Sequence, residues 1–198
     1  MNFLAHIYLS GNDTFRIIGN FIADVVRGNQ YLQYPEQIQK GILLHRFIDF
    51  YTDQHPVFRQ TKHRLHENYG HYSGVISDMY YDYFLAKNWG KYHQDSIEIF
   101  ANNFYQLLQE HRDLLPDKIQ RMSKHMIADN WLVSYQSIQG MQRILYQMDY
   151  RTGFKSKMQF ATKELQIWEN EMEQEFFQFF QDLQQQCTQK IKELESTF

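Results

Sequence analysis

Histidine and aspartate side chains recur at a spacing of four residues in the first half of this chain of 198 residues. His45, Asp49 and Asp53 follow one another at this interval, and Asp78 and Asp82 repeat it. Because residues four apart stack on one face of an α-helix, each group would present its ionisable side chains together. Apolar residues flank both groups, and a carboxylate in apolar surroundings is costly unless a cation or a hydrogen-bond donor compensates it.

Two further residues extend this set, since Asp24 lies inside the apolar run FIADVV and His6 lies inside NFLAHIYL. Histidine and several carboxylates on neighbouring helices form a donor set that suits Mn²⁺, Mg²⁺ or Fe²⁺. Such an ion lowers the pKa of bound water and stabilises charge on a phosphoryl oxygen. The pattern therefore predicts a divalent metal site with six candidate ligands: His6, Asp24, His45, Asp49, Asp78 and Asp82.

Ion pairing is a competing explanation for each part of this pattern. Each candidate carboxylate outside the 45–53 group has a basic residue that could neutralise it: Arg27 for Asp24, and Arg46 or Lys87 for Asp78 and Asp82. His6 taken alone also fits a hydrogen-bonded histidine of the core. Spacing alone therefore leaves two alternatives open, a metal-dependent enzyme and a non-catalytic helical interaction module with a structural ion-pair network.

The elements that must position these side chains are predicted to be helices. The chain has only 3 Pro and 9 Gly, and no alternation of apolar and polar residues long enough for a strand. Hydrophobic residues make up 43% and aromatic residues 17%, which is enough for a substantial core. We predict an all-α, single-domain helical bundle over residues 1–198. A basic linker is predicted at 149–156, and one long C-terminal helix follows it at 157–195. The other predicted helices span residues 13–27, 35–54, 57–68, 74–89, 95–112, 116–128 and 130–148.

Composition and charge exclude several classes of function. The net charge of −3 gives no general attraction to nucleic acid or to an anionic membrane. The single Cys187 excludes an intramolecular disulfide and a cysteine-rich zinc site. No apolar run approaches the ~18–20 residues that span a bilayer, and the N-terminal segment lacks the basic start of a signal peptide. We expect a cytoplasmic protein, and the sequence does not fix its oligomeric state.

Four segments, in order, resemble the acyl carrier protein phosphodiesterase family: MNFLAHIYLS, GNFIADVVRGN, GILLHRFIDFYTDQHP and SDMYYDYFLAKNW. They cover most of residues 1–90, and the likeness continues more weakly through WLVSYQSIQGMQRIL into the last helix. The resemblance implies an all-helical, HD-domain-like, metal-dependent enzyme in which Mn²⁺ is favoured. It also implies the reaction, in which metal-activated water cleaves the phosphodiester between 4′-phosphopantetheine and a serine of holo-acyl carrier protein, giving the apo protein.

The resemblance also assigns roles to residues of the matching motifs. The implied catalytic residues are Asp24, Arg27, His45, Arg46, Asp49 and Asp53. Among them His45, Asp49 and Asp24 are the first choices for metal ligands, and an arginine would neutralise the non-bridging oxygens. An aspartate outside the metal shell would serve as base. Arg27 and Arg46 fit equally well as salt-bridge partners of these aspartates.

Two features depart from the family pattern. The chain contains no His-Asp dipeptide, so the ligand set of HD-domain enzymes cannot be transferred directly. Tyr83 follows Asp82 where a histidine is expected. The tyrosine at this position is compatible with two explanations: a metal ligand set that differs from the family's, or a position that supports the ligands without binding the metal. A related HD-like phosphohydrolase, acting on a nucleotide or another small phosphoester, is the alternative enzyme.

Basic residues are the predicted contacts for a carrier protein, because acyl carrier proteins are strongly acidic. One group is Arg59, Lys62 and Arg64, in the predicted helix 57–68; the other is Arg151, Lys155 and Lys157, in and after the linker. Charged runs that merely solvate a surface are the competing explanation for both groups.

Overall fold

The computed structural model describes residues 1–197, in which α-helices and short 3₁₀ turns occur and no strand does. The predicted all-α class is confirmed. The helices are α1 (Phe3–Leu9), α2 (Thr14–Ile22), α3 (Glu36–Gln54), α4 (Pro56–Tyr69), α5 (Ser73–Lys87), α6 (Ile97–Glu110), α7 (Asp117–Ala128), α8 (Trp131–Ser134), α9 (Ile138–Arg151), α10 (Thr162–Ile167) and α11 (Glu169–Thr197).

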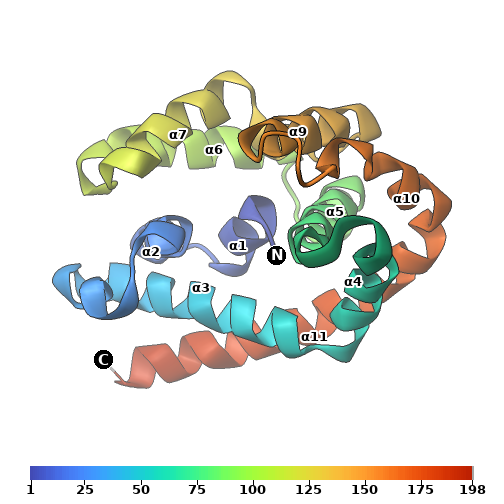
Figure 1. Cartoon of the computed structure of the whole chain (residues 1–198). Helices are drawn as coiled ribbons and strands as arrows, with labels where there is room; N and C mark the ends of the chain where they lie inside the picture. Colours follow the sequence, from blue (N-terminus) through green and yellow to red (C-terminus); the bar gives the residue numbers. More distant parts are fainter. Residues whose placement is uncertain (198) are drawn as a thin grey trace.

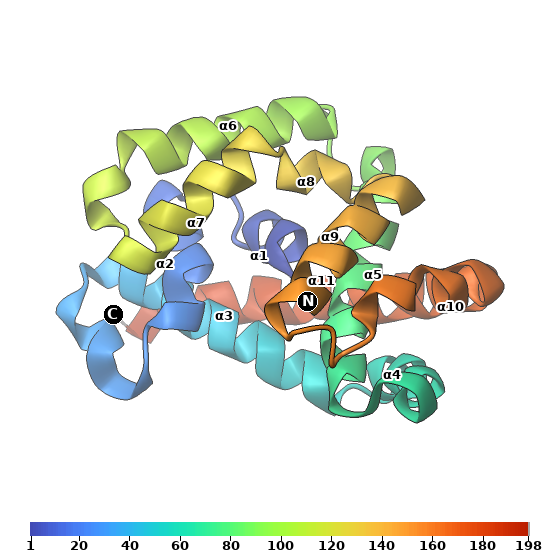
Figure 2. The ribbon, with the colours of Figure 1, turned by 45° about the horizontal axis from the view of Figure 1, so that its top comes forward.

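The helices enclose α1, which lies in the middle of the bundle (Figures 1 and 2). Helices α2, α3 and α11 form one side of it, and α6, α7 and α9 form the other (Figure 1). One cluster of buried apolar side chains extends from Met1 to Leu194 and includes Phe176, Phe179 and Phe180 of α11. The bundle with a long C-terminal helix is thus confirmed. None of the described helices has the length and apolar character needed to cross a membrane.

Several predicted boundaries agree with the structure because a local residue fixes them. The Asp13 carboxylate accepts a hydrogen bond from the Arg16 backbone N–H at 2.7 Å, which caps the start of α2. Pro56 has no backbone N–H that could continue the hydrogen bonding of α3. Helix α3 therefore ends at Gln54 and α4 begins at Pro56, with His55 between them. The predicted turn at 70–74 is shorter than expected, since α5 already begins at Ser73.

The predicted helix 13–27 is wrong at its C-terminal end. Helix α2 ends at Ile22, and a 3₁₀ turn, η1 (Ala23–Val25), carries Asp24. A second 3₁₀ segment, η2 (Gly28–Gln33), follows. The Arg46 guanidinium of α3 donates to the carbonyls of Val26 and Gly28 at 3.0 and 2.8 Å. These bonds occupy carbonyls that a continuing α-helix would use, and so stabilise the bend.

The predicted helix 130–148 is in fact two helices, α8 and α9. The break lies between Ser134 and Ile138, because the Ser137 hydroxyl accepts from the Gly140 N–H at 3.0 Å and caps α9. Gly140 does not interrupt the helix; a Cβ there would lie 1.9 Å from the Ser134 carbonyl, so glycine permits this tight turn. Helix α9 also continues to Arg151, which shortens the predicted linker 149–156.

The last predicted helix, 157–195, is likewise divided. It consists of a 3₁₀ turn, η6 (Met158–Phe160), then α10 and α11, with the chain bending at Trp168. The apolar pattern of this segment predicts Trp168, Phe176 and Phe179 as its core or interface face. Phe176 and Phe179 are fully buried, whereas the Trp168 ring is 41% exposed and lies under the Arg64 guanidinium of α4 at 5.8 Å.

Helices α2 and α3 pack with their backbones in contact at two glycines. A Cβ on Gly19 would lie 2.1 Å from the Ile38 carbonyl oxygen, and one on Gly41 would lie 2.2 Å from the Arg16 carbonyl oxygen. Both distances are far below contact between non-bonded atoms. The close approach matters for the neighbouring residues, because Asn20 follows Gly19 and His45 lies one turn after Gly41.

We predict that Gly19→Ala and Gly41→Ala each lower the free energy of unfolding by about 3 kcal/mol or more, since the added methyl must push two backbones apart. Urea unfolding followed by far-UV circular dichroism measures this. Gly74→Ala is the matched control, because a Cβ there meets only the Lys62 side chain, at 3.6 Å. Its stability should be unchanged or rise by up to about 1 kcal/mol. Equal effects at all three positions would contradict the proposed backbone contact.

Candidate functional site

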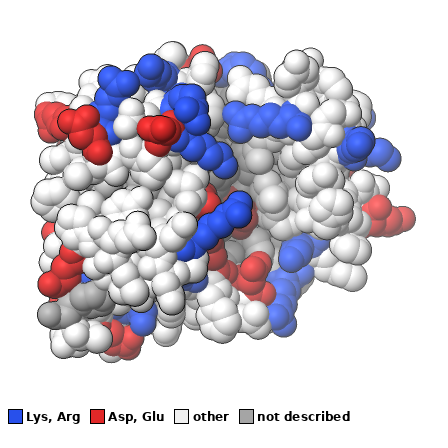
Figure 3. All heavy atoms as spheres, turned by 60° about the vertical axis from the view of Figure 1, so that its left-hand side comes forward, with Lys and Arg blue, Asp and Glu red and all other residues white. Residues whose placement is uncertain are grey.

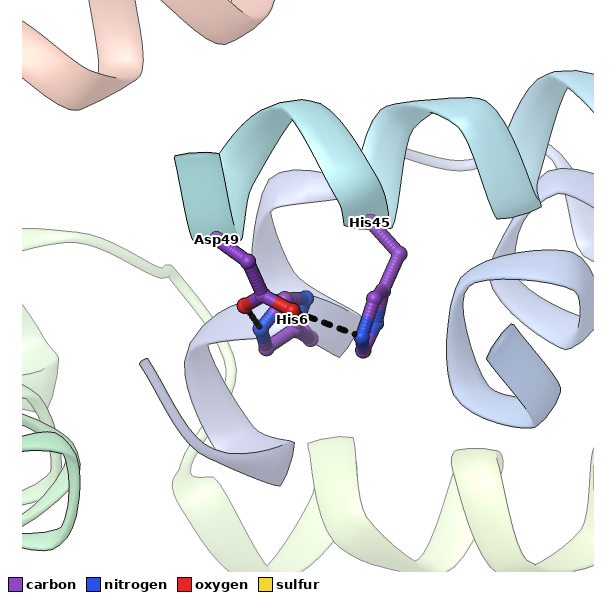
Figure 4. A group of neighbouring side chains, drawn as sticks. All are labelled: His6, His45 and Asp49. Carbon is purple, nitrogen blue, oxygen red and sulfur yellow. Dashed lines mark ion pairs between the residues drawn. The ribbon is translucent and has the colours of Figure 1, made fainter. Parts of the chain in front are cut away.

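Four ionisable side chains from three elements meet beside α1. His6 Nε2 of α1 lies 3.2 Å from one Asp49 oxygen, and His45 Nε2 of α3 lies 3.1 Å from the other. Asp24 reaches the same His45 nitrogen from η1, at 3.2 Å. Figure 4 shows the two imidazoles and Asp49 turned toward one another. The structure thus brings together four of the six predicted metal ligands.

Asn20 of α2 holds both imidazoles from the opposite side. Its Oδ1 atom lies 2.8 Å from His6 Nδ1 and 3.0 Å from His45 Nδ1. Its Nδ2 donates to the His6 carbonyl at 3.1 Å and to Ser10 Oγ at 2.8 Å, which fixes the amide with its oxygen toward the histidines. An amide oxygen only accepts, so each histidine donates from Nδ1 and turns Nε2 toward the carboxylates.

This geometry limits how much positive charge the two rings can carry. Their centroids are 4.1 Å apart with an interplanar angle of 27°, so two imidazolium ions here would repel each other. Burial disfavours the protonated form of both histidines, but the net pKa shifts have opposite directions. In His6 the neighbouring His45 adds to burial and the pKa falls to about 4. In His45 the bonds to Asp24 and Asp49 outweigh burial and raise the pKa to about 9.

The carboxylates respond to the same contacts. Burial alone would raise the pKa of Asp49, but its contacts with His45 and His6 outweigh burial and hold the pKa below its usual value. The His45 bond lowers the pKa of Asp24. Carboxylates that stay ionised beside imidazole Nε2 atoms must share a proton or a cation with them. One ligand atom from each of His6, His45 and Asp49 lies within 4.8 Å of the others, so this group can hold a metal ion.

The cluster forms the polar end of a pocket of about 450 Å³. Apolar residues from α5, α8 and α9 and the connecting segment line much of the remainder: Val75, Met79, Trp131, Tyr135, Ile144 and Met148. Figure 3 shows a face of the molecule that is hollowed, with acidic side chains inside the hollow and Lys and Arg side chains around it. A pocket that joins ionisable groups to an apolar wall suits a ligand with a charged end and a less polar body.

Three other predicted aspartates have different surroundings. Asp53 and Asp78 line the pocket. Asp78 pairs with the Met1 ammonium at 2.7 Å, yet burial outweighs that pairing and raises the pKa of Asp78 to about 6. Asp82 is fully buried and accepts from the backbone N–H groups of residues 2, 4 and 5, at 3.1, 2.7 and 3.4 Å. It thereby caps α1, and it is not among the residues that line the pocket.

The structure places neither predicted catalytic arginine in the pocket wall. Arg46 is held by the carbonyls of Val26 and Gly28, and its guanidinium lies over the Tyr31 ring at 5.2 Å. Arg27 is exposed at the start of η2. The salt bridges considered for these arginines do not form within the described residues either. Asp24 pairs with His45, Asp78 pairs with the Met1 ammonium, and Asp82 accepts from backbone N–H groups. Lys87, another predicted partner, contacts Glu169 and Glu173 of α11.

The two predicted partner-binding groups differ in whether their basic side chains are already paired within the protein. In α4, Arg64 pairs with Glu175 at 2.5 Å, and Arg59 donates to the Asp53 carbonyl and the Gln54 side chain. Lys62 is half-buried. In α9 and the segment after it, Arg151, Lys155 and Lys157 are exposed, and none of them forms an ion pair within residues 1–197. Arg151 also lines the pocket.

Tyr83 lies away from the cluster. Its hydroxyl donates to Glu169 of α11 at 2.8 Å, beside the Lys87 ion pair, and it does not line the pocket. The residue joins α5 to α11, which gives it a structural position in this chain.

Among the residues that line the site, sequence reasoning missed three whose polar groups face the chemistry most directly or stay unpaired: Asn20, Thr52 and Trp131. Asn20 stands in the GNFIAD segment and Thr52 directly before Asp53, so both lie within motifs already singled out. Thr52 Oγ1 and Trp131 Nε1 are buried polar atoms without a hydrogen-bond partner among the described residues. Buried polar atoms are rarely left unpaired, and at a pocket wall they point to a ligand. No periodicity in the sequence shows which face of 131–134 meets α1.

Comparison with known proteins agrees with the resemblance seen in the motifs. Three relatives are each called acyl carrier protein phosphodiesterase. The protein from Photorhabdus laumondii subsp. laumondii is 28% identical, over 96% of this chain and 96% of its own length. The Yersinia enterocolitica protein is 27% identical over 96% and 99%, and the Escherichia coli O6:H1 protein 28% over the same shares.

No solved structure matches the chain significantly, so the likeness to HD-domain enzymes stays a prediction. Residues 1–183 match the family model described as acyl carrier protein phosphodiesterase. That match spans every element of the pocket, and it shows that this chain belongs to the acyl carrier protein phosphodiesterase family.

Proposed function

We propose that this protein hydrolyses the phosphodiester between 4′-phosphopantetheine and the serine of holo-acyl carrier protein, releasing the apo protein. The observation that carries the proposal is the pair of imidazoles whose Nε2 atoms face Asp49 at 3.1–3.2 Å at one end of a pocket. Membership of the family and the names of its relatives supply the substrate. An enzyme acting on a carrier protein of the cell interior would work in the cytoplasm.

The donor set supports a divalent ion as cofactor, with Mn²⁺ the first choice and Mg²⁺ or Fe²⁺ as alternatives. His6 and His45 would bind through Nε2, and Asp49 and Asp24 through carboxylate oxygens, because Asn20 occupies both Nδ1 positions. When bound, the ion would lower the pKa of a water molecule and offset charge on the phosphoryl group. Asp78 and Asp82, the remaining predicted ligands, would support this shell from α5.

Two further carboxylates in the pocket wall are available for proton transfer. Asp53 lies one turn after Asp49 on α3, and Asp78 faces it from α5. A carboxylate that is not engaged by a metal can accept the proton of the attacking water. We assign this role to Asp53. The Asp78 carboxyl, whose pKa is raised by burial to about 6, is the second choice.

The carrier protein would dock on the surface around the end of α9. There Tyr146, Tyr150 and Phe154 are exposed and in contact, at centroid distances of 5.7 and 5.8 Å. Arg151, Lys155 and Lys157 lie within three residues of Tyr150 or Phe154 in the sequence and are exposed, whereas Asp149, the one acid between residues 131 and 163, is buried. An acidic protein fits this surface better than the α4 group, whose Arg64 charge is already paired with Glu175.

Mass spectrometry of the carrier protein tests the reaction. Incubating holo-acyl carrier protein with this enzyme and Mn²⁺ should remove the phosphopantetheine mass, and a chelator should prevent the loss. Asp49→Asn should slow the reaction by at least about 100-fold, because it removes the carboxylate shared by both histidines. An unchanged carrier mass, with cleavage of a nucleotide or a small phosphodiester instead, would favour the alternative phosphohydrolase.

Asn20 variants test the arrangement of the metal site. Asn20→Ala should weaken Mn²⁺ binding by about 10- to 100-fold, because both imidazoles lose the acceptor that orients them. Asn20→Asp, which keeps an acceptor oxygen, should retain more of the affinity. Isothermal titration with MnCl₂ measures both, with Asn170→Ala on the exposed face of α11 as control. Wild-type affinity in folded Asn20→Ala would rule out this ligand orientation.

Charge reversal tests the docking surface. The double variant Lys155→Glu/Lys157→Glu should reduce kcat/KM for holo-acyl carrier protein by roughly 10-fold or more at low salt, and leave a small phosphodiester substrate unaffected. Lys118→Glu/Lys124→Glu on α7 carries the same change in charge and should have little effect. Arg59→Glu/Lys62→Glu tests the α4 group in parallel. A larger loss with this third variant would move the docking site to α4.

A further inference from the structure

The pocket has an excess of negative charge that an anionic substrate must overcome. Four aspartates line it: Asp24, Asp49, Asp53 and Asp78. A divalent ion and the Met1 ammonium, which pairs with Asp78, offset only part of this charge. A phosphodiester that enters such a pocket needs further positive charge near the phosphorus, because its own negative charge is repelled by the carboxylates close to it.

Arg151 is the one Lys or Arg among the described residues that line this pocket. It stands at the last turn of α9, and Gln147 and Met148 of the preceding turn line the same wall. Helix α9 passes on the opposite side of α1 from α3 (Figures 1 and 2). Its pocket-lining residues therefore belong to a different wall from His45 and Asp49 of α3. A phosphoryl group bound between these two walls would meet the metal-binding cluster on one side and Arg151 on the other.

The Arg151 guanidinium is also positioned and free to bind an anion. It lies over the Trp131 ring, 5.9 Å from the centroid, and forms no ion pair within residues 1–197. A guanidinium stacked on an aromatic ring keeps its planar set of N–H donors available at its edge. The loop after it is held by buried Asp149, which accepts from Ser156 Oγ at 2.6 Å. Arg46, by contrast, donates from Nη2 to the backbone carbonyls of Val26 and Gly28.

We propose that Arg151 binds the non-bridging phosphate oxygens of the substrate, with Trp131 as the positioning residue beneath it. The proposal rests on the proposed phosphodiester hydrolysis and assigns the arginine role to a residue outside the HRFID and VRGN motifs. It also separates Arg151 from Lys155 and Lys157, which lie outside the pocket wall and would contact only the carrier protein.

Kinetics on a small phosphodiester, bis(p-nitrophenyl) phosphate, test the assignment without a docking surface. Arg151→Gln should lower kcat/KM by roughly 10- to 100-fold, the loss expected for one charged hydrogen-bonding group. Arg151→Lys, which keeps the charge but not the planar donors, should recover part of it. Arg121→Gln, on the exposed face of α7, is the matched control and should be unchanged. Equal activity of Arg151→Gln and Arg121→Gln would overturn the proposal, as would a loss confined to the carrier protein substrate.

Binding of inorganic phosphate provides a readout that does not depend on turnover. In titrations of the Mn²⁺-loaded protein, Arg151→Gln should raise the dissociation constant of phosphate at least about tenfold, and Arg121→Gln should not. The dissociation constant of phosphate should stay near the parent value in Trp131→Phe. In Trp131→Leu it should lie between the values of the parent and of Arg151→Gln. Both comparisons use variants whose urea unfolding is unchanged. If the parent protein cleaves no phosphodiester but this order of phosphate affinities holds, the proposed function fails while the Arg151 site stands. A parent that binds no phosphate would overturn the site.

Discussion

The hydrogen bonds from two histidines to one amide oxygen organise the site. Asn20 Oδ1 accepts from His6 and His45, so α1, α2 and α3 are joined at a single buried atom. The bond fixes the tautomer of each ring and aims both Nε2 atoms at Asp49. A shared proton or a bound cation must then satisfy the facing acceptors. Either rearrangement of Asn20 or separation of α2 from α3 would remove the orientation of both ligands at once.

The remaining helices complete a pocket around that point and give it two unlike sides. Helices α1 and α3 contribute groups that can bind a metal ion, while α8 and α9 contribute aromatic and aliphatic side chains together with Arg151. Asp82 of α5 accepts hydrogen bonds from three backbone N–H groups at the start of α1, which fixes the position of this helix and of His6 within it. A single hydrophobic core under both sides keeps them at a fixed separation.

Local patterns predicted the parts of this arrangement that depend on local chemistry. The spacing of His45 and Asp49, the apolar setting of Asp24 and His6, and the breaks at Asp13 and His55 all follow from residues close in sequence. Asn20 and Arg151 were harder to identify, because their roles depend on which helices meet. The same applies to Arg46 and Asp82: each looked like a reactive group, and each is engaged by backbone atoms of a distant segment. The break at Ser137, by contrast, follows from a local cap that sequence reasoning overlooked, while Trp168 lies against Arg64 of the distant helix α4.

The contact at Gly19 and Gly41 has a consequence for protein engineering. These two positions carry no functional group, yet they leave no room for a side chain, so the half of the site built on α2 and α3 tolerates little redesign. The opposite wall has no such constraint at Ile144, Gln147 and Met148, which lie on one exposed-to-half-buried face of α9. Libraries that seek new prosthetic-group or phosphodiester specificities should therefore vary α9 and leave the α2–α3 pair unchanged.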